Sequence, residues 1–121
     1  MGRGVYLKYK LENSLEKRQQ ESKRILNSYP DKVPVICEKD PYSKYAKTLE
    51  CSQYLVPFDT TVEQFLFMIK KKLGLGSSSG IFLITVKGSR LFGEEKMKDI
   101  YHFYKDSEDN LLYLIYMREL N

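Results

Sequence analysis

The side chains that most often carry catalysis or metal binding are few in this sequence and lie far apart along it. His102 is the single histidine, and Cys37 and Cys51 are the only cysteines. Nucleophilic catalysis and metal binding both need several such groups that converge, and the cysteines do not have C-x-x-C spacing. Glu94 and Glu95 are adjacent, and adjacent carboxylates in a loop rarely converge on one bond. We therefore expect no catalytic residue, no metal ligand, no cofactor, and two reduced thiols.

Patterns for phosphate or nucleic-acid binding are also weak. Gly74-Leu75-Gly76 continues into neither a dinucleotide-binding motif nor a P-loop, and glycine at this place is typical of a helix end. Lys70, Lys71 and Lys72 precede it, where cations complement the helix dipole. The net charge of +4 mixes both signs along the chain. A basic domain that binds nucleic acid or anionic lipid is therefore the alternative, and we expect no nucleic-acid partner.

The composition is typical of one globular domain, with 121 residues of which 42% are hydrophobic and 30% are charged. The apolar run at residues 81–86 is far shorter than the ~18 residues that a membrane-spanning helix needs. Arg3, Lys8 and Lys10 interrupt the N-terminal region, which is unlike a signal peptide. The expected location is therefore the cytosol or nucleus, and the expected state is a monomer.

Helices are predicted where capping residues precede a helical apolar pattern. Ser14 is a typical N-cap for a helix that Pro30 ends. Thr60-x-x-Glu63 has the spacing of a capping box, which predicts a helix that starts at Thr61. A short helix is expected at residues 97–104, and residues 1–13 are expected to form a shorter helical or irregular lead-in.

Four apolar segments are predicted as strands, at residues 32–38, 53–56, 81–86 and 111–116. The first two suggest a long hairpin, in which Pro34 favours an edge or bulged position because proline cannot donate a ladder hydrogen bond. The continuous apolar character of residues 81–86 predicts burial on both faces. This order is that of an α+β fold, the ubiquitin-like β-grasp with a four-stranded mixed sheet. Residues 1–29 would form an N-terminal helical extension and residues 30–121 the core, within one compact domain.

The helix predicted from Thr61 carries more apolar side chains than one core-facing stripe needs. Phe67 and Met68 lie off the stripe, whose members are Val62, Phe65, Leu66, Ile69 and Leu73. Either the N-terminal helix or a bound partner, such as a peptide, covers this surplus. The residues alone leave both interpretations open.

Several segments in sequence order carry a resemblance that covers nearly the whole chain: Leu15–Arg18, Tyr29–Lys39, Tyr54–Pro57, Thr61–Phe65 and Leu112–Tyr116. They closely resemble the autophagy-related protein 8 family of ubiquitin-like modifiers, which includes the GABA-receptor-associated protein and the microtubule-associated light chain type. The resemblance implies an adaptor, not an enzyme. Such an adaptor is cytoplasmic and lies on autophagosome membranes when it is lipidated.

The resemblance also implies a binding site for receptor peptides of the form aromatic-x-x-aliphatic. Such peptides add a strand to the edge of the second strand. Carried over by matching position, the pocket for the aromatic anchor comprises Glu21, Ile25, Pro34, Ile36, Gln53, Leu55 and Leu111. The pocket for the aliphatic anchor comprises Lys32, Tyr54, Val56, Pro57, Phe65, Met68 and Lys72.

The sequence departs from the family pattern around the aromatic pocket. Family members usually have lysines at the positions of Cys51 and Gln53, and an aromatic residue at the position of Leu111. We therefore expect a softer pocket and a weaker dependence on acidic residues before the aromatic anchor of the peptide.

Two further expectations concern the ends of the sequence. The family is conjugated to phosphatidylethanolamine through a C-terminal glycine, whereas the last glycine here is Gly93. The processing cysteine protease and the activating and conjugating enzymes are therefore expected partners only of a form with a glycine beyond Asn121. Arg3, Val5 and Tyr6, with their basic neighbours, either contact anionic membrane or cytoskeleton, as in relatives, or form a solvated lead-in.

Overall fold

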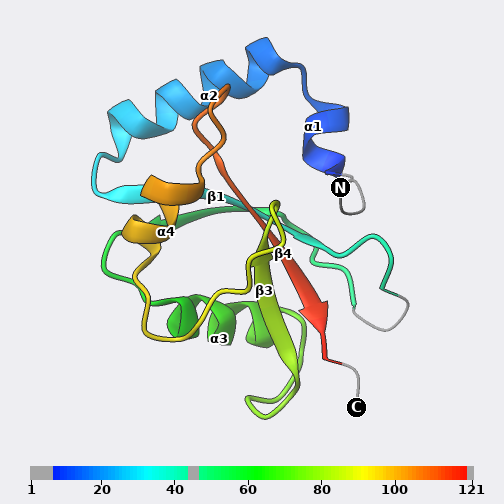
Figure 1. The fold of residues 1–121 in the computed structure, drawn as a ribbon. Helices are drawn as coiled ribbons and strands as arrows, with labels where there is room; N and C mark the ends of the chain where they lie inside the picture. Colours follow the sequence, from blue (N-terminus) through cyan, green and yellow to red (C-terminus); the bar gives the residue numbers. More distant parts are fainter. Residues whose placement is uncertain (1–6, 44–46, 120–121) are drawn as a thin grey trace.

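The computed structural model describes residues 7–43 and 47–119, and their secondary structure follows the predicted order (Figure 1). Arg3, Val5 and Tyr6 lie outside the described residues. The helices are α1 Lys8–Glu12, α2 Leu15–Ser28, α3 Val62–Lys72 and α4 Met97–Tyr104. The strands are β1 Lys32–Lys39, β2 Gln53–Pro57, β3 Ile81–Thr85 and β4 Leu112–Arg118.

The four strands form one mixed sheet in the order β2-β1-β4-β3. β1 is antiparallel to β2 and parallel to β4, and β3 is antiparallel to β4. The predicted hairpin and the return of the last strand to the middle of the sheet are both confirmed. β2 and β3 are consequently the two edges of the sheet.

Pro34 lies in an interior strand, so its predicted edge or bulged position is wrong. The backbone N–H of Cys37 donates to Ser52 across the β1–β2 ladder, and alternation then directs the nitrogen of Pro34 away from β2. On that other side, pairing with β4 begins only at Val35, opposite Leu112. The proline therefore occupies the one end of the strand where the missing N–H breaks no ladder bond.

α3 begins one residue later than predicted. The side chain of Thr61, not Thr60, accepts from the backbone N–H of Gln64 (3.1 Å), and the side chain of Gln64 accepts from the N–H of Thr61 (2.9 Å). Both threonines have capping-box spacing to a suitable partner. The carbonyl of Thr60 instead accepts from Met97 (2.8 Å), which ties it to the start of α4. Ser14 caps α2 as predicted, by accepting from Lys17.

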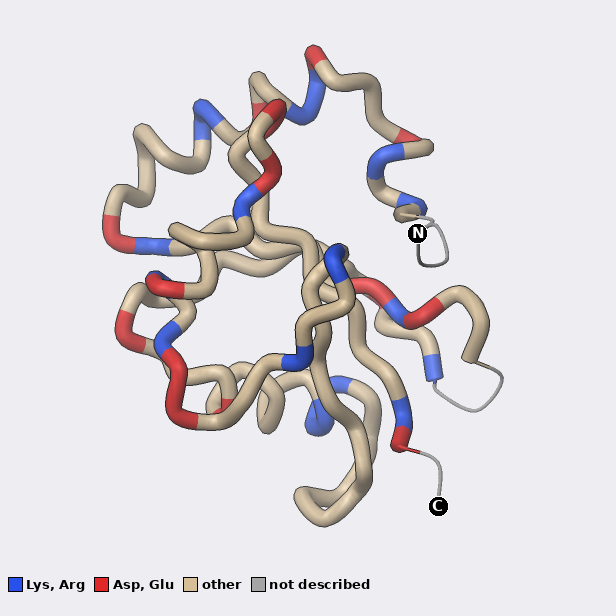
Figure 2. The backbone as a smooth tube through the Cα atoms, viewed as in Figure 1, with Lys and Arg blue, Asp and Glu red and all other residues tan. Residues whose placement is uncertain are grey.

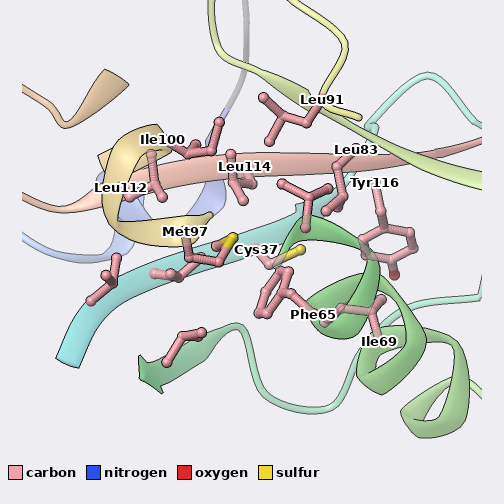
Figure 3. Close-up of a cluster of buried hydrophobic side chains, with 14 of the residues drawn as sticks. Cys37, Phe65, Ile69, Leu83, Leu91, Met97, Ile100, Leu112, Leu114 and Tyr116 are labelled. Carbon is pink, nitrogen blue, oxygen red and sulfur yellow. The ribbon is translucent and has the colours of Figure 1, made fainter. Parts of the chain in front are cut away.

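Two helical layers cover opposite faces of the sheet (Figure 1). α3 and α4 pack on one face, where the main core contains Phe65, Ile69, Leu83, Met97 and Tyr116 among others (Figure 3). On the other face, a smaller buried cluster joins the N-terminal segment to the sheet, through Leu7, Tyr9, Ile36, Leu111, Tyr113 and Ile115. The interpretation that the N-terminal helix covers Phe67 on α3 is therefore wrong, because that helix lies across the sheet and Phe67 is 52% exposed.

β3 is buried on one face, not on both as its apolar run predicted. Ile81, Leu83 and Thr85 are buried, whereas Phe82 and Ile84 are only partly covered. The reason is position, because β3 is an edge strand and α2 packs mainly against β1, two strands away. In the described part of the chain, no helix has the length and apolar character needed to cross a bilayer.

Candidate peptide-binding edge

The outer edge of β2 presents backbone groups that no other strand pairs. Because Cys37 donates to Ser52, the antiparallel register places Tyr54 and Val56 in hydrogen-bonded pairs with β1. The amides and carbonyls of Gln53 and Leu55 consequently point away from β1, toward the free edge. An extended segment of another chain could pair with these groups as a further strand.

A cavity of about 180 Å³, here named the first pocket, opens beside this edge on the face covered by α2. Its walls come from α1, α2, β1, β2 and the residue just before β4. It is lined by all seven residues predicted for the aromatic anchor, namely Glu21, Ile25, Pro34, Ile36, Gln53, Leu55 and Leu111, together with Tyr9, Arg24, Val35 and Tyr54. Leu55 is 40% exposed at its mouth, whereas Ile36 and Leu111 are almost fully buried at its base.

The rim of the first pocket carries little net charge. The carboxylate of Glu21 accepts hydrogen bonds from Nε and Nη2 of Arg24, one turn further along α2. Both side chains are partly exposed, at 35% and 62%, so this pair contributes little to stability. The pairing neutralises the acid that faces an incoming peptide. Cys51 and Gln53, on the opposite side, are uncharged.

A buried network holds two walls of the first pocket in place. Nη1 of Arg18 on α2 lies 2.6 Å from Oδ2 of Asp109, with the two side chains 9% and 0% exposed. The hydroxyl of Tyr113 donates to the same carboxylate (2.6 Å), and the backbone N–H of Leu111 donates to its other oxygen (2.9 Å). Burial and the hydrogen bond to Asp109 raise the pKa of Tyr113, so its hydroxyl keeps its proton. Asp109 thereby fixes both α2 and Leu111.

The residues predicted for the aliphatic anchor, here named the second contact set, centre on the opposite face of β2, next to α3, and Lys32 and Pro57 pair at the end of the β1–β2 ladder. Val56 and Phe65 are 4% and 1% exposed and belong to the main core. The ring of Tyr54 packs edge-on against Phe65 with centroids 5.9 Å apart, and Nζ of Lys72 lies 5.9 Å from the Tyr54 ring centroid. Met68 is partly buried against the same core, Lys32 is also partly buried, and Pro57 is exposed.

The two cysteines have different environments. Cys37 is fully buried, and burial raises the pKa of its thiol. Cys51 is exposed just before β2, and its thiol donates to the carbonyl of Gln53 (3.5 Å), one of the groups at the free edge. The hydroxyl of Tyr54 donates to the carbonyl of Cys51, and burial raises the pKa of Tyr54 to about 12. Cys51 is therefore the accessible thiol of the two.

The lysines that end α3 do not converge on one site. Nζ of Lys70 donates to the carbonyl of Ser77, Lys71 lies over the ring of Phe67, and Lys72 lies over Tyr54. Acidic and basic positions are interleaved over the rest of the chain (Figure 2). Within residues 7–43 and 47–119, no group of three or more His, Cys, Asp or Glu side chains is placed to hold a metal ion.

Sequence reasoning missed Tyr9 and Arg24 in the first pocket and Asp109 behind it. Tyr9 belongs to a segment whose fold carried no clear pattern, and its 7% exposure comes from packing near Tyr113. Arg24 lies three residues after Glu21, a spacing that predicts an ion pair on a helix. Asp109 had no local signal, since its partner Arg18 is 91 residues away.

A mixed four-stranded sheet with α3 and α4 on one face and an N-terminal helical extension on the other is the arrangement of a ubiquitin-like fold. The family described as "Autophagy protein Atg8 ubiquitin like" matches residues 17–121. Autophagy-related protein 8a of Arabidopsis thaliana is 40% identical over 111 residues, which cover 92% of this chain and 88% of that protein. Autophagy-related protein 8 of Mycosarcoma maydis is 41% identical, covering 92% of each.

A solved structure agrees with these relatives. The crystal structure of Trypanosoma brucei ATG8 superposes with a TM-score of 0.87 at 35% identity, covering 96% of this chain and 97% of that one. The chain belongs to the Atg8 family of ubiquitin-like autophagy proteins. It is accordingly not an enzyme, and it works with the autophagy machinery in association with membranes.

Proposed function

We propose that this protein binds aromatic-x-x-aliphatic peptides of autophagy receptors and autophagy machinery by strand addition at the free edge of β2. The aromatic side chain enters the first pocket, and the aliphatic side chain contacts the second contact set. The observation that carries the proposal is the position of these two sites on opposite faces of β2, an edge strand whose outer side pairs with no other strand.

The spacing of the motif fits this arrangement. Side chains alternate between the two faces of a strand, so residues three apart point to opposite faces. An added strand that places its aromatic residue toward α2 therefore places the residue three positions later toward α3. Backbone pairing supplies affinity that tolerates many sequences, and the two anchors supply specificity.

The order of the two sites sets the direction of the peptide. The first pocket includes Gln53, at the start of β2, whereas the second contact set extends to Pro57, at its end. Because the aromatic residue precedes the aliphatic one, the peptide runs parallel to β2. Its upstream residues then pass Cys51 and Gln53, and its downstream residues pass Lys32 and Lys72.

The charges along this path predict that acidic residues before the aromatic anchor contribute little to binding. Gln53 and Cys51 are neutral, and Arg24 already pairs with Glu21. The cations Lys32 and Lys72 lie at the downstream end. Leu111 at the base of the pocket gives it an aliphatic rather than an aromatic wall.

Membrane attachment is a separate part of the proposal. A form that carries the family's C-terminal glycine would be trimmed by a cysteine protease and joined to phosphatidylethanolamine by activating and conjugating enzymes. The receptor peptides would thereby be held at the autophagosome membrane, with the unconjugated protein in the cytoplasm. Intact-mass analysis of the protein from cells tests this part, and absence of a lipid adduct when autophagy is induced would contradict it.

Calorimetric titration with an aromatic-x-x-leucine peptide tests peptide binding. We expect a Kd in the micromolar range for the unmodified protein, because two buried anchors add about 1.5–3 kcal/mol each to the backbone pairing of the added strand, and association costs offset part of the sum. Leu55→Arg should abolish binding, since Leu55 lies at the mouth of the pocket. Phe103→Arg, at a 77% exposed position on α4, is the matched control and should bind normally. Failure of the unmodified protein to bind, or normal binding by Leu55→Arg, would refute the proposal.

A further inference from the structure

The segment that leads into β2 reaches the free edge without regular secondary structure of its own. Residues 47–52, here named the entry segment, form no helix or strand, and Gln53 follows them as the first residue of β2. Four of the six side chains are exposed, and Leu49 is the partly buried hydrophobic residue that packs against the main core. Hydrophobic packing therefore contributes little to the position of the entry segment.

A buried tyrosine hydroxyl holds the beginning of the entry segment. The hydroxyl of Tyr116 donates to the backbone carbonyl of Lys47 and accepts from the backbone N–H of Leu49 (3.1 Å). A tyrosine hydroxyl is both a donor and an acceptor, so one group satisfies two backbone groups that lie two residues apart. This pair of bonds fixes both the place and the direction of the chain at that point.

Two further bonds hold the end of the entry segment. The hydroxyl of Tyr54 donates to the carbonyl of Cys51, and the backbone N–H of Cys37 donates to the carbonyl of Ser52 (2.8 Å). Within residues 7–43 and 47–119, no other hydrogen bond reaches the backbone of the entry segment. The Tyr116 hydroxyl therefore supplies two of its four backbone bonds.

Tyr116 is itself held rigidly in the middle of the sheet. It lies on β4, where it pairs with Leu83 on β3 and with Lys39 on β1. Its side chain is 0% exposed and belongs to the main core between the sheet and α3 (Figure 3). Its carbonyl accepts from the backbone N–H of Asp40 (3.0 Å), just after β1. Burial raises the pKa of Tyr116 to about 12, so the hydroxyl keeps the proton that it donates to Lys47.

The position of the entry segment decides where the free edge of β2 begins. The paired register of β1 and β2 ends at Ile36 and Gln53. Gln53 also lines the first pocket, and its backbone groups point to the free edge. An added strand binds more tightly to an edge that is already ordered, because ordering a loose segment on binding costs free energy.

We propose that Tyr116 is a positioning residue for peptide recognition: its hydroxyl holds the entry segment and so keeps the first residues of the free edge in place for strand addition. This proposal rests on the proposed function, because it concerns the same edge of β2. Tyr116 is fully buried and does not touch the peptide. Its contribution is the order of the edge before the peptide arrives.

Calorimetry on Tyr116→Phe tests the proposal, because this change keeps the buried ring and removes the hydroxyl. The N–H of Leu49 and the carbonyl of Lys47 then lose their partner. For an aromatic-x-x-leucine peptide that also carries residues before the aromatic anchor, we expect the Kd to rise about fivefold, within the range for one lost hydrogen bond. A peptide that begins at its aromatic residue should lose less affinity, because it does not extend along the entry segment.

Amide hydrogen exchange by NMR separates positioning from general stability. In the unmodified protein the N–H of Leu49 should be protected, although it lies in an irregular segment. In Tyr116→Phe, exchange should become faster at Leu49 and at Tyr54, near the start of β2, and stay unchanged at Val56 in the same strand.

Ile100→Val is the matched control variant. Ile100 is 2% exposed and belongs to the same core, at the other end of the cluster from Tyr116 (Figure 3). The loss of a buried methyl group should lower the unfolding free energy. It should leave both the peptide Kd and the exchange at Leu49 unchanged, because Ile100 does not hold the entry segment.

The outcomes separate this proposal from the proposed function. If the unmodified protein binds no peptide, the proposed function fails and this proposal fails with it. If Tyr116→Phe binds the peptide as tightly as the unmodified protein, or if Leu49 already exchanges fast in the unmodified protein, Tyr116 is not a positioning residue and the proposed function stands. If Ile100→Val weakens binding by the same factor, the effect reflects general stability and this proposal is overturned.

Discussion

Removal of the Asp109 carboxylate should destabilise the protein more than loss of any surface ion pair. Asp109 is 1% exposed and accepts from Arg18, from the Tyr113 hydroxyl and from the backbone of Leu111. In Asp109→Ala the guanidinium of Arg18 stays buried without its partner, and two further donors lose their acceptor. The change therefore removes the link between α2 and the segment before β4.

The expected cost is about 3–5 kcal/mol of unfolding free energy, the range for breaking a buried pair by removing one partner. Arg90 and Glu119 form a comparison pair at 2.6 Å with side chains 45% and 42% exposed. Glu119→Ala should cost about 1 kcal/mol or less, because exposed pairs are weak.

Urea unfolding, followed by circular dichroism, measures both values. The double variant Arg18→Met/Asp109→Leu should recover most of the lost stability, since no buried charge is then left unpaired. Asp109→Ala should also weaken peptide binding, because Asp109 fixes Leu111 and α2 around the first pocket. A cost equal to that of Glu119→Ala would refute this account of how α2 is held.

Three further predictions concern titration, thiol reactivity and peptide charge. Burial alone would raise the pKa of Asp106, but hydrogen bonds from Lys10 (2.5 Å) and from the backbone of Glu108 and Asp109 lower it. The stability that Asp106 contributes should therefore be complete above its unfolded pKa of about 3.9 and be lost as pH falls through the lower folded value. The unfolding free energy of Asp106→Asn should accordingly approach that of the unmodified protein in acid, and a constant difference down to pH 2 would contradict the assignment. Iodoacetamide should label Cys51 before Cys37, and bound peptide should slow the labelling of Cys51 because it covers the edge beside that residue. Mass spectrometry of the tryptic peptides measures the labelling of each cysteine. If bound peptide left the labelling of Cys51 unchanged, the peptide would bind elsewhere. Alanine substitution of the peptide's acidic residues before its aromatic anchor should weaken binding to this protein less than binding to relatives that have lysines at the positions of Cys51 and Gln53. Calorimetry on both proteins measures the two losses of affinity. An equal loss would be evidence against this prediction.

Much of the fold could be predicted from local patterns, and the errors occurred where tertiary contacts choose between local alternatives. Thr60 and Thr61 both satisfy the capping spacing, and only the contact of the Thr60 carbonyl with Met97 decides between them. The apolar run at residues 81–86 predicts a strand buried on both faces, but the burial of β3 depends on its position at the edge of the sheet, which the sequence does not show. Pro34 reads as an edge residue because the sequence does not show where pairing with β4 begins.

The candidate site was likewise predictable only in part. The seven residues of the first pocket were assigned through resemblance, and the structure brings them around one cavity. Hydrophobic periodicity alone found only the apolar surplus of α3, with Phe67 and Met68. The contribution of Tyr9 and the support from Asp109 depend on contacts between distant parts of the chain, which no spacing rule predicts.

Amide hydrogen exchange by NMR tests the central claim most directly, because it reports strand addition itself. The N–H groups of Gln53 and Leu55 point to the free edge and should exchange fast in the unbound protein. Saturating aromatic-x-x-leucine peptide should slow exchange at Leu55 and Gln53, while the amides inside α3 stay unchanged. Tight binding of the peptide with no added protection at either residue would show that the edge of β2 is not where the peptide pairs.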